Sequence, residues 1–324
     1  MDFGVGLFAL QSTAMQPTHW ASAYQELRDY AVLLEDLGYK QLWITEHHFY
    51  YDGFCPSPLI AAASALAATH KLRVGTGVLL LPLYDAKRLA AISHDLNQRS
   101  GGRLDIGAGL GFRPVEFAGH GVSKKARLRT FTARLEVLER KEQDGGGPRL
   151  WVGTAVAEGA ARAGAHGHPI ILSGLNSIAV CASLIEAHRK GWEEAGRPGG
   201  VWPGAAAYRN IWMTGSRMER EAALDWVRAS YVQYIGLGLS VGSAQAATLN
   251  FAEDSDRAIK TAVDTTITGT VDEVEQQLRQ LQAIGFEQVA FRLVLDGAPR
   301  AAVESQLRRL ATELLPRFRS ESKP

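Results

Sequence analysis

Three adjacent titratable side chains, Glu46, His47 and His48, follow a short apolar segment and the polar residue Thr45. That segment, residues 42–44, predicts a buried strand, so the three polar residues stand at its carboxyl end. In a barrel of alternating strands and helices, this end of each strand faces the active site. A histidine there can give or take a proton near neutral pH. We therefore interpret the cluster as chemical, with hydrogen bonds to neighbouring backbone as the alternative role.

Glycines interrupt a second apolar segment, residues 72–81, where Gly75 and Gly77 flank Thr76. Glycine weakens the interior of a strand, so its presence there usually marks a bulge or a place where a ligand approaches the backbone. More glycines follow in the loop at 107–111, but their spacing is not the GxGxxG of a dinucleotide site. Their loop could still expose backbone N–H groups to a cofactor.

The composition is that of an ordinary folded protein and argues against several classes of partner. Lys and Arg number 35 against 34 Asp and Glu, so no net charge attracts nucleic acid or an anionic membrane. The two cysteines, Cys55 and Cys181, lack the spacing of a disulfide framework or a zinc site, and we expect no metal. The apolar runs are too short for a signal peptide or a bilayer crossing, so we expect a cytoplasmic protein.

The elements that must position these residues alternate along the chain. Predicted strands lie at 3–10, 41–46, 72–81, 103–107, 149–153, 169–173, 208–214 and 288–295. Predicted helices lie at 24–37, 59–69, 87–98, 123–140, 158–165, 177–195, 218–234, 271–284 and 301–317. Eight strands, each followed by a helix, predict one α/β domain over residues 1–324, a (β/α)₈ TIM barrel. Residues 235–267, after strand seven, break this regularity, and we predict that they form a lid.

Basic residues cluster at the start of the predicted helix 123–140, among them Lys124, Arg127 and Arg129. The amino end of a helix favours anions, so cations are poorly placed there. A bound phosphate would resolve the mismatch, and a solvated helix face is the alternative.

Several stretches together resemble the bacterial luciferase-like flavin monooxygenases in order and spacing. They are TEHHF (45–49), VGTGVLLLP (74–82), SGGR (100–103), GHPIILS (167–173) and ITGT (267–270). The resemblance covers essentially the whole chain. It implies an oxidoreductase that uses reduced FMN and dioxygen, or a deazaflavin in one branch of the superfamily.

Carried over residue by residue, the resemblance implies that His47 is the catalytic histidine beside the flavin, with Glu46 preceding it. It also implies a cis peptide between Gly77 and Val78 beneath the flavin ring, and a phosphate contact by Arg127. The cofactor-binding residues expected in this way are Thr76, Gly77, Val78, Gly107, Gly109, Arg127, Gly153, Thr154 and Ser173.

This sequence departs from the family pattern at several positions. Leu110 replaces an arginine, and Ala155 and Val156 stand where luciferase has a Glu-Ser pair. Ala91 and Asn97 replace acidic residues that are common in the third helix. The changes at Leu110, Ala155 and Val156 argue against tight binding of the flavin phosphate.

Three functions are compatible with these residues. The first is a two-component monooxygenase that receives reduced FMN from a separate flavin reductase and oxygenates a small apolar substrate. The peroxide that reduced flavin gives with oxygen must then be kept from water. Five aromatic residues could wall such a pocket or simply pack in the core: Trp43, Phe49, Tyr50, Tyr51 and Phe54. The second is a deazaflavin-dependent oxidoreductase on the same barrel. The third is a barrel that binds flavin without turnover. We expect a homodimer in the first case.

Overall fold

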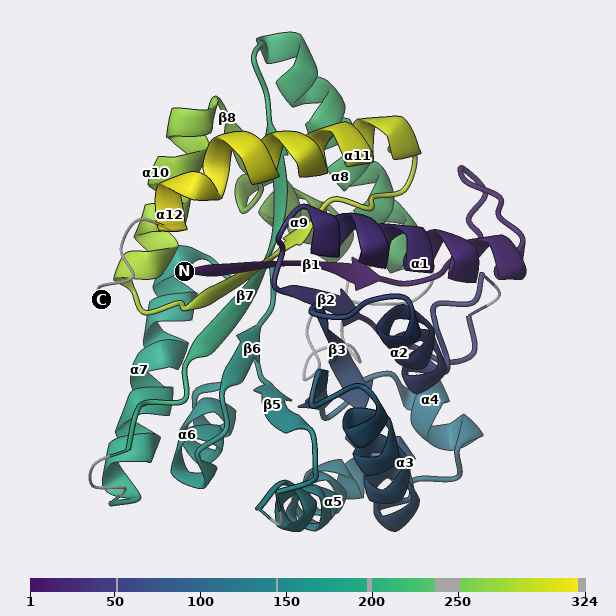
Figure 1. The fold of residues 1–324 in the computed structure, drawn as a ribbon, viewed down its shortest axis with the longest axis vertical. Coiled ribbons are helices and arrows are strands. Elements are labelled where there is room, and N and C mark those ends of the chain that lie inside the picture. Colours follow the sequence, from purple (N-terminus) through teal and green to yellow (C-terminus); the bar gives the residue numbers. More distant parts are fainter. Residues whose placement is uncertain (51, 144, 197–199, 237–250, 320–324) are drawn as a thin grey trace.

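Eight parallel strands close into a barrel surrounded by helices (Figure 1). The structure is a computed structural model and describes residues 1–50, 52–143, 145–196, 200–236 and 251–319. Each strand pairs with the next, and β9 closes the ring by pairing with β7 and β1. The ring consists of β1 (Asp2–Phe8), β2 (Gln41–Ile44), β3 (Arg73–Leu80), β4 (Leu104–Gly109), β5 (Arg149–Gly153), β6 (Ile170–Leu172), β7 (Ala205–Met213) and β9 (Gln288–Arg292). The predicted barrel and its eight strands are confirmed.

An additional strand lies outside this ring. β8 (Ile267–Gly269) pairs in parallel with the end of β7, opposite Ile211–Met213. The predicted insertion ends at residue 267, and no strand was predicted over 267–269. Three residues are too few for a hydrophobic period to be visible, because strand and helix patterns differ only over longer windows.

Helices cover the outside of the barrel. The larger ones are α1 (Trp20–Asp36), α2 (Pro58–Ala67), α3 (Ala86–Arg99), α5 (Arg127–Gln143), α6 (Ala157–His166), α7 (Ile178–Glu194), α8 (Arg217–Gly236), α10 (Val271–Ala283) and α11 (Arg300–Arg309). Side-chain caps fix where three of them begin, since Asp85, Ser177 and Thr270 each accept the N–H of the residue three positions later. Within the described part of the chain, no helix has both the length and the apolar character needed to span a bilayer.

Two shorter elements modify the predicted pattern. The loop after β4 contains the helix α4 (Pro114–Gly119), and the predicted helix 123–140 begins as a 3₁₀ turn, Lys124–Ala126, before α5. Residues 237–250 of the predicted lid lie outside the described residues. The part that follows forms α9 (Phe251–Asp264), which packs against α8. A closing motion of this segment stays a prediction.

Side chains fill the barrel interior below its carboxyl end. Trp43, Trp151 and Tyr208 form an apolar cluster, with the two indole rings edge to face at 5.6 Å between centroids. Gly75 makes room for this packing, because a Cβ at that position would lie 2.6 Å from the Trp43 ring. Gly75 is therefore needed for core packing, and the barrel interior below the carboxyl ends of the strands is filled with side chains.

Candidate active site

A cavity of about 480 Å³ opens at the carboxyl ends of the barrel strands. Its size lies within the range of about 300–1,000 Å³ that small-molecule sites occupy. Residues from all eight barrel strands or the loops after them line it, and α8 adds one wall. The location is the one where TIM barrels carry their active sites.

The loops around this cavity hold unusual backbone conformations. Leu10, Phe49, Phe54 and Cys55 have φ angles between 46° and 61°, and within the described chain they are the only non-glycine residues with positive φ. All four lie in the loops after β1 and β2. L-residues adopt this region at a cost, and such residues cluster at functional sites because the surroundings hold them there.

Glu116 holds the His47 ring in one orientation. Nδ1 of His47 donates to Oε1 of Glu116 over 3.0 Å, and the same oxygen accepts the backbone N–H of His48, also over 3.0 Å. The Glu116 side chain is completely buried on α4. A carboxylate can only accept, so it fixes the proton on Nδ1 and leaves Nε2 of His47 with a lone pair for a molecule in the cavity. This arrangement prepares Nε2 to take up a proton.

Apolar rings surround the same imidazole. Phe54 packs edge-on against His47 at 4.7 Å between centroids, and Tyr50, Phe112 and Tyr234 lie within 6.3 Å. His47 is only 6% exposed among these rings, so proton exchange there depends on what occupies the cavity.

Glu46, beside His47 in sequence, has a different environment. Its Oε2 accepts the N–H of Leu80 over 2.8 Å, and its Oε1 accepts the Tyr84 hydroxyl over 2.8 Å and Nε2 of His48 over 2.5 Å. Only 1% of Glu46 is exposed. Both oxygens are therefore engaged, and the residue ties the loop after β2 to the end of β3.

The segment Gly77–Val78 forms a shelf in the cavity. The peptide between these residues is cis, as predicted, and the Gly6–Leu7 peptide of β1 is cis as well. A Cβ on Gly77 would lie 2.0 Å from the Tyr208 hydroxyl, and Cβ atoms on Gly109 or Gly153 would lie 2.3 and 2.7 Å from methyl groups of Val78. Three glycines thus allow the strands to close around Val78 and Tyr208.

Several polar atoms of the cavity wall are buried without a partner among the described residues. They include the hydroxyl of Tyr208, Oδ1 of Asn210 and Oδ2 of Asp296. Burial raises the pKa of Tyr208 well above its ordinary value, so its hydroxyl stays protonated and can donate. Unpaired buried polar groups are costly, so these three atoms leave hydrogen-bonding capacity in the cavity wall that the described residues do not satisfy.

A second, small cavity adjoins the first. Leu110, Gly153 and Thr154 line both, and Arg162 and His166 line only the small one. Gly159 in the first turn of α6 also lines this small cavity, and α6 begins after its N-cap Val156 with no side chain capping its amino end. A helix amino end with an arginine beside it is suited to an anion.

The predicted site residues separate into three groups. Gly77, Val78, Gly109, Gly153, Thr154 and Ser173 line the main cavity together with Glu46 and His47. Thr76 and Gly107 lie below the lining; the Thr76 hydroxyl donates to the Gly107 carbonyl over 3.0 Å and joins β3 to β4. Arg127 lines neither cavity, and its guanidinium donates to the Lys124 carbonyl.

The predicted aromatic wall is present in part. Phe54 lines the cavity, whereas Trp43 is completely buried beneath it. Tyr50 packs behind Phe54, and Phe49 is 57% exposed and covers Gly119 instead. Tyr51 lies outside the described residues.

Sequence reasoning missed Glu116, Tyr208, Asn210 and Asp296. A local signal existed for the helix of Glu116, because Pro114 at the first helical position with an acidic residue soon after is a typical helix start. Polar residues inside the otherwise apolar β7 were also a signal. The contact between Glu116 and His47 joins residues 69 positions apart, and no local pattern predicts it.

Comparison with known proteins is consistent with this geometry. A sequence model of the luciferase-like monooxygenase family matches residues 1–288. The 4-hydroxyprotoasukamycin monooxygenase of Streptomyces nodosus is 27% identical, and the match covers 98% of this chain and 92% of that protein. The uncharacterized protein y4vJ of Sinorhizobium fredii is 29% identical over 57% of this chain, and the chain spans only 60% of that protein.

Solved structures share the fold at low sequence identity. The oxygenating component of 3,6-diketocamphane monooxygenase from Pseudomonas putida, in complex with FMN, is 16% identical, with a TM-score of 0.77 and 98% of each chain covered. An F420-dependent secondary alcohol dehydrogenase is also 16% identical, with a TM-score of 0.73 and coverage of 97% of this chain and 98% of that one. FMN and deazaflavin proteins are therefore both among its structural neighbours.

Proposed function

Because the chain belongs to the luciferase-like monooxygenase family, we propose that it is a monooxygenase dependent on reduced FMN. In this proposal a separate flavin reductase supplies the reduced cofactor, and dioxygen supplies one atom to a small, largely apolar organic substrate. The observation that carries the proposal is His47, held by a buried carboxylate and enclosed by aromatic rings at the edge of the main cavity.

The cavity fits a flavin in three respects. Its volume suits a flat ring system, the Gly77–Val78 shelf offers backbone on which a ring can lie, and the unpaired Tyr208 hydroxyl can donate to a ring heteroatom. The phosphate end would lie toward Thr154 and Arg162, because the amino end of α6 and the small cavity adjoin there. Bound reduced FMN would supply the electrons for activating oxygen, a chemistry that amino acid side chains lack.

His47 would hold or move the proton that the reaction needs. Its Nε2 accepts that proton, and the resulting positive charge is stabilised by the Glu116 carboxylate 3.0 Å from Nδ1. Glu46 would act as a positioning residue, since both of its carboxylate oxygens already accept hydrogen bonds, from His48, Leu80 and Tyr84. The rings around His47 would keep water away from the reacting atoms.

The polar wall formed by Asn210, Arg292 and Asp296 would orient the substrate. These residues line the side of the cavity formed by β7 and β9, away from the proposed phosphate end at β5 and α6. The Arg292 guanidinium stacks over the Tyr231 ring at 5.1 Å. A substrate with an apolar body and one or two polar groups suits such a wall.

A homodimer remains part of the proposal. Val32, Ile60 and Ile92 are exposed by 42%, 64% and 45% on α1, α2 and α3. These helices lie on one side of the barrel (Figure 1). Exposed apolar side chains on these three helices support an association surface on this side.

Two other functions remain candidates. The likeness in fold to an F420-dependent dehydrogenase favours deazaflavin chemistry, in which oxygen takes no part. The apolar residues at Leu110, Ala155 and Val156 favour a barrel that binds flavin weakly or without turnover.

The experiment combines the protein with a purified flavin reductase, NADH, FMN and ¹⁸O₂. The compounds offered are 3,6-diketocamphane, on which one structural neighbour acts, together with simpler cyclic ketones and aliphatic aldehydes. We expect one ¹⁸O atom in a product, with the yield lost in His47→Ala and kept in His70→Ala, which changes an exposed histidine elsewhere. Equal hydrogen peroxide release by all three proteins, without oxygenated product, would contradict the proposal.

A further inference from the structure

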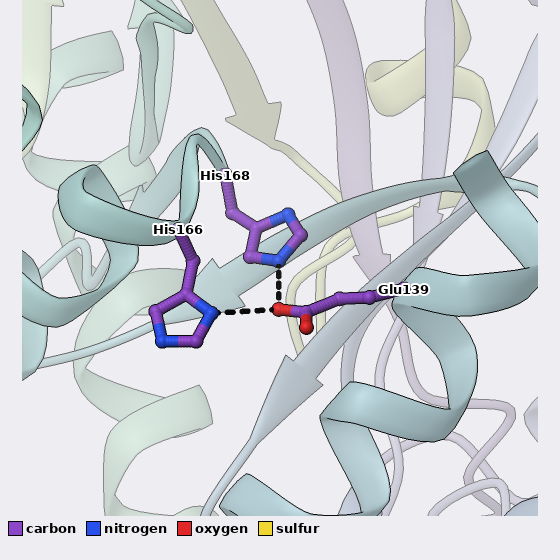
Figure 2. A group of neighbouring side chains, drawn as sticks. All are labelled: Glu139, His166 and His168. Atoms are coloured by element: carbon purple, nitrogen blue, oxygen red, sulfur yellow. Dashed lines mark hydrogen bonds and ion pairs between the residues drawn. The ribbon is translucent and has the colours of Figure 1, made fainter. Parts of the chain in front are cut away.

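Two histidines and a glutamate converge outside the main cavity (Figure 2). Oε1 of Glu139 on α5 lies 3.0 Å from Nδ1 of His166 and 2.7 Å from Nε2 of His168. His166 ends α6, and His168 precedes β6. Each residue offers one atom that can ligate a metal, and these three atoms all lie within 4.8 Å of one another. His166 also lines the small cavity, but the mechanism proposed above gives none of the three residues a role.

From this geometry we propose that Glu139, His166 and His168 bind one divalent d-block cation such as Zn²⁺. Zinc takes imidazole nitrogen and carboxylate oxygen at about 2.0–2.2 Å, which places tetrahedral ligands about 3.3 Å apart. Glu139 Oε1 would therefore withdraw by roughly 0.3 Å from His166 and 0.6 Å from His168, a small change of side-chain torsion. Two imidazoles favour zinc, cobalt, nickel or copper over magnesium and calcium, which prefer oxygen ligands.

The backbone presents the two imidazoles in a fixed arrangement. Gly167 between them has φ of 81° and ends α6 in the left-handed conformation. The N–H of Gly167 donates to the Gly164 carbonyl and that of His168 to the Ala163 carbonyl, each over 2.9 Å. This turn aims both rings at α5. A side chain at position 167 would be strained at this φ, so glycine is required by the arrangement.

A buried contact fixes the same segment from behind. The His168 carbonyl accepts Nε2–H of His188 over 2.8 Å, and Nδ1 of His188 accepts the Trp202 indole N–H over 3.0 Å. The backbone that carries His168 is thereby anchored to α7. Sites built on such anchored elements keep their ligands near the binding geometry before the ion arrives.

Access and local charge also suit a cation. The side chain of His166 is 43% exposed, whereas those of His168 and Glu139 are 6% and 14% exposed, so an ion can enter from the His166 side and keep water on its open position. His166 is the last residue of α6, and the carboxyl end of a helix favours positive charge. The ion would join α5 to the turn between α6 and β6.

The alternative to a metal ion is a pair of hydrogen bonds, in which His166 and His168 each donate an N–H to the Glu139 carboxylate. Tag-free protein is treated with a chelator, dialysed, and titrated with Zn²⁺ and with Co²⁺ by calorimetry and visible absorption, without flavin. We expect one ion per chain and a raised thermal midpoint with zinc but not with Mg²⁺. Because flavin is absent, failure here leaves the proposed function untouched.

Variants distinguish a bound metal ion from hydrogen bonds alone. His166→Ala removes a half-exposed ligand that the core does not need, and Glu139→Gln keeps the shape of the carboxylate. Each variant should weaken Zn²⁺ binding by about tenfold or more and abolish the rise in the thermal midpoint. Loss of a ligand costs at least as much affinity as loss of the hydrogen bond that supports it. His70→Ala, at another exposed histidine, should bind like the parent. Absence of stoichiometric Zn²⁺ binding in the parent protein, or equal binding by His166→Ala, would overturn the proposal.

Discussion

Arg162 and Arg127 offer a direct test of where the flavin phosphate binds. The resemblance to the family points to Arg127, whereas the structure places Arg162, and not Arg127, in the small cavity beside Thr154. We predict that Arg162→Ala weakens FMN and leaves riboflavin, which has no phosphate, unchanged. Arg127→Ala should leave both unchanged.

The size of the effect follows from exposure. A charge-assisted hydrogen bond contributes about 1.5–3 kcal/mol, and two unit charges 4 Å apart in water attract by about 1 kcal/mol. Arg162 is exposed, so solvent screening places its contribution near the lower values, about 1–1.5 kcal/mol. At about 1.4 kcal/mol per factor of ten, the dissociation constant for FMN should rise roughly 5- to 12-fold.

Equilibrium titrations of FMN and riboflavin against the parent and both alanine variants measure this effect at low and moderate salt. Arg162→Lys should retain part of the affinity, because it keeps the charge but loses the planar fork. Leu110→Arg restores the arginine of the family at a position that lines both cavities, and it should tighten FMN but not riboflavin. Equal weakening of FMN and riboflavin by Arg162→Ala, or FMN-selective weakening by Arg127→Ala, would refute this placement.

Three further predictions concern the histidine, a cysteine and the surface. His47→Ala should lower the rate of product formation by roughly 10²-fold. Glu116→Gln keeps a hydrogen-bond acceptor but loses the charge, and it should lower the same rate by about tenfold. Full activity of either variant would make that residue structural. Burial, and then the Glu46 carboxylate, raises the pKa of the Cys55 thiol to about 12. Iodoacetamide at pH 8 should therefore label Cys55 only after unfolding. Rapid labelling of the folded protein would contradict this burial. If Ile60 and Ile92 lie in a dimer interface, replacing both by glutamate should halve the mass measured by light scattering, whereas an unchanged mass would place any interface elsewhere.

The barrel could be predicted from the sequence because its strands are long apolar segments separated by helices with a clear period. Segments such as residues 72–81 and 288–295 show this signal without any tertiary information. The misses are short or depend on distant contacts. β8 exists through its pairing with the end of β7, and α4 is a helix of six residues inside a glycine-rich loop.

The site was predictable where chemistry and position coincide, and less so where packing decides. His47 lies three residues after the end of a buried strand, so its place at the barrel mouth was evident. The engagement of Glu46 and the orientation of His47 depend on Tyr84 and Glu116, which the fold brings from 38 and 69 positions away. The sequence could not show that Gly75 packs against Trp43 whereas Gly77 lines the cavity, because this depends on where the side chains lie.

Anaerobic titration of the protein with reduced FMN, oxidised FMN and the deazaflavin F420 tests the central claim most directly. Trp151, in the core below the cavity, gives a fluorescence signal that a bound flavin should quench. We predict that reduced FMN binds about tenfold or more tightly than oxidised FMN, because the protein must accept it from a reductase, and that F420 binds weakly. Equal affinity for both redox states of FMN, or a clear preference for F420, would contradict the monooxygenase account.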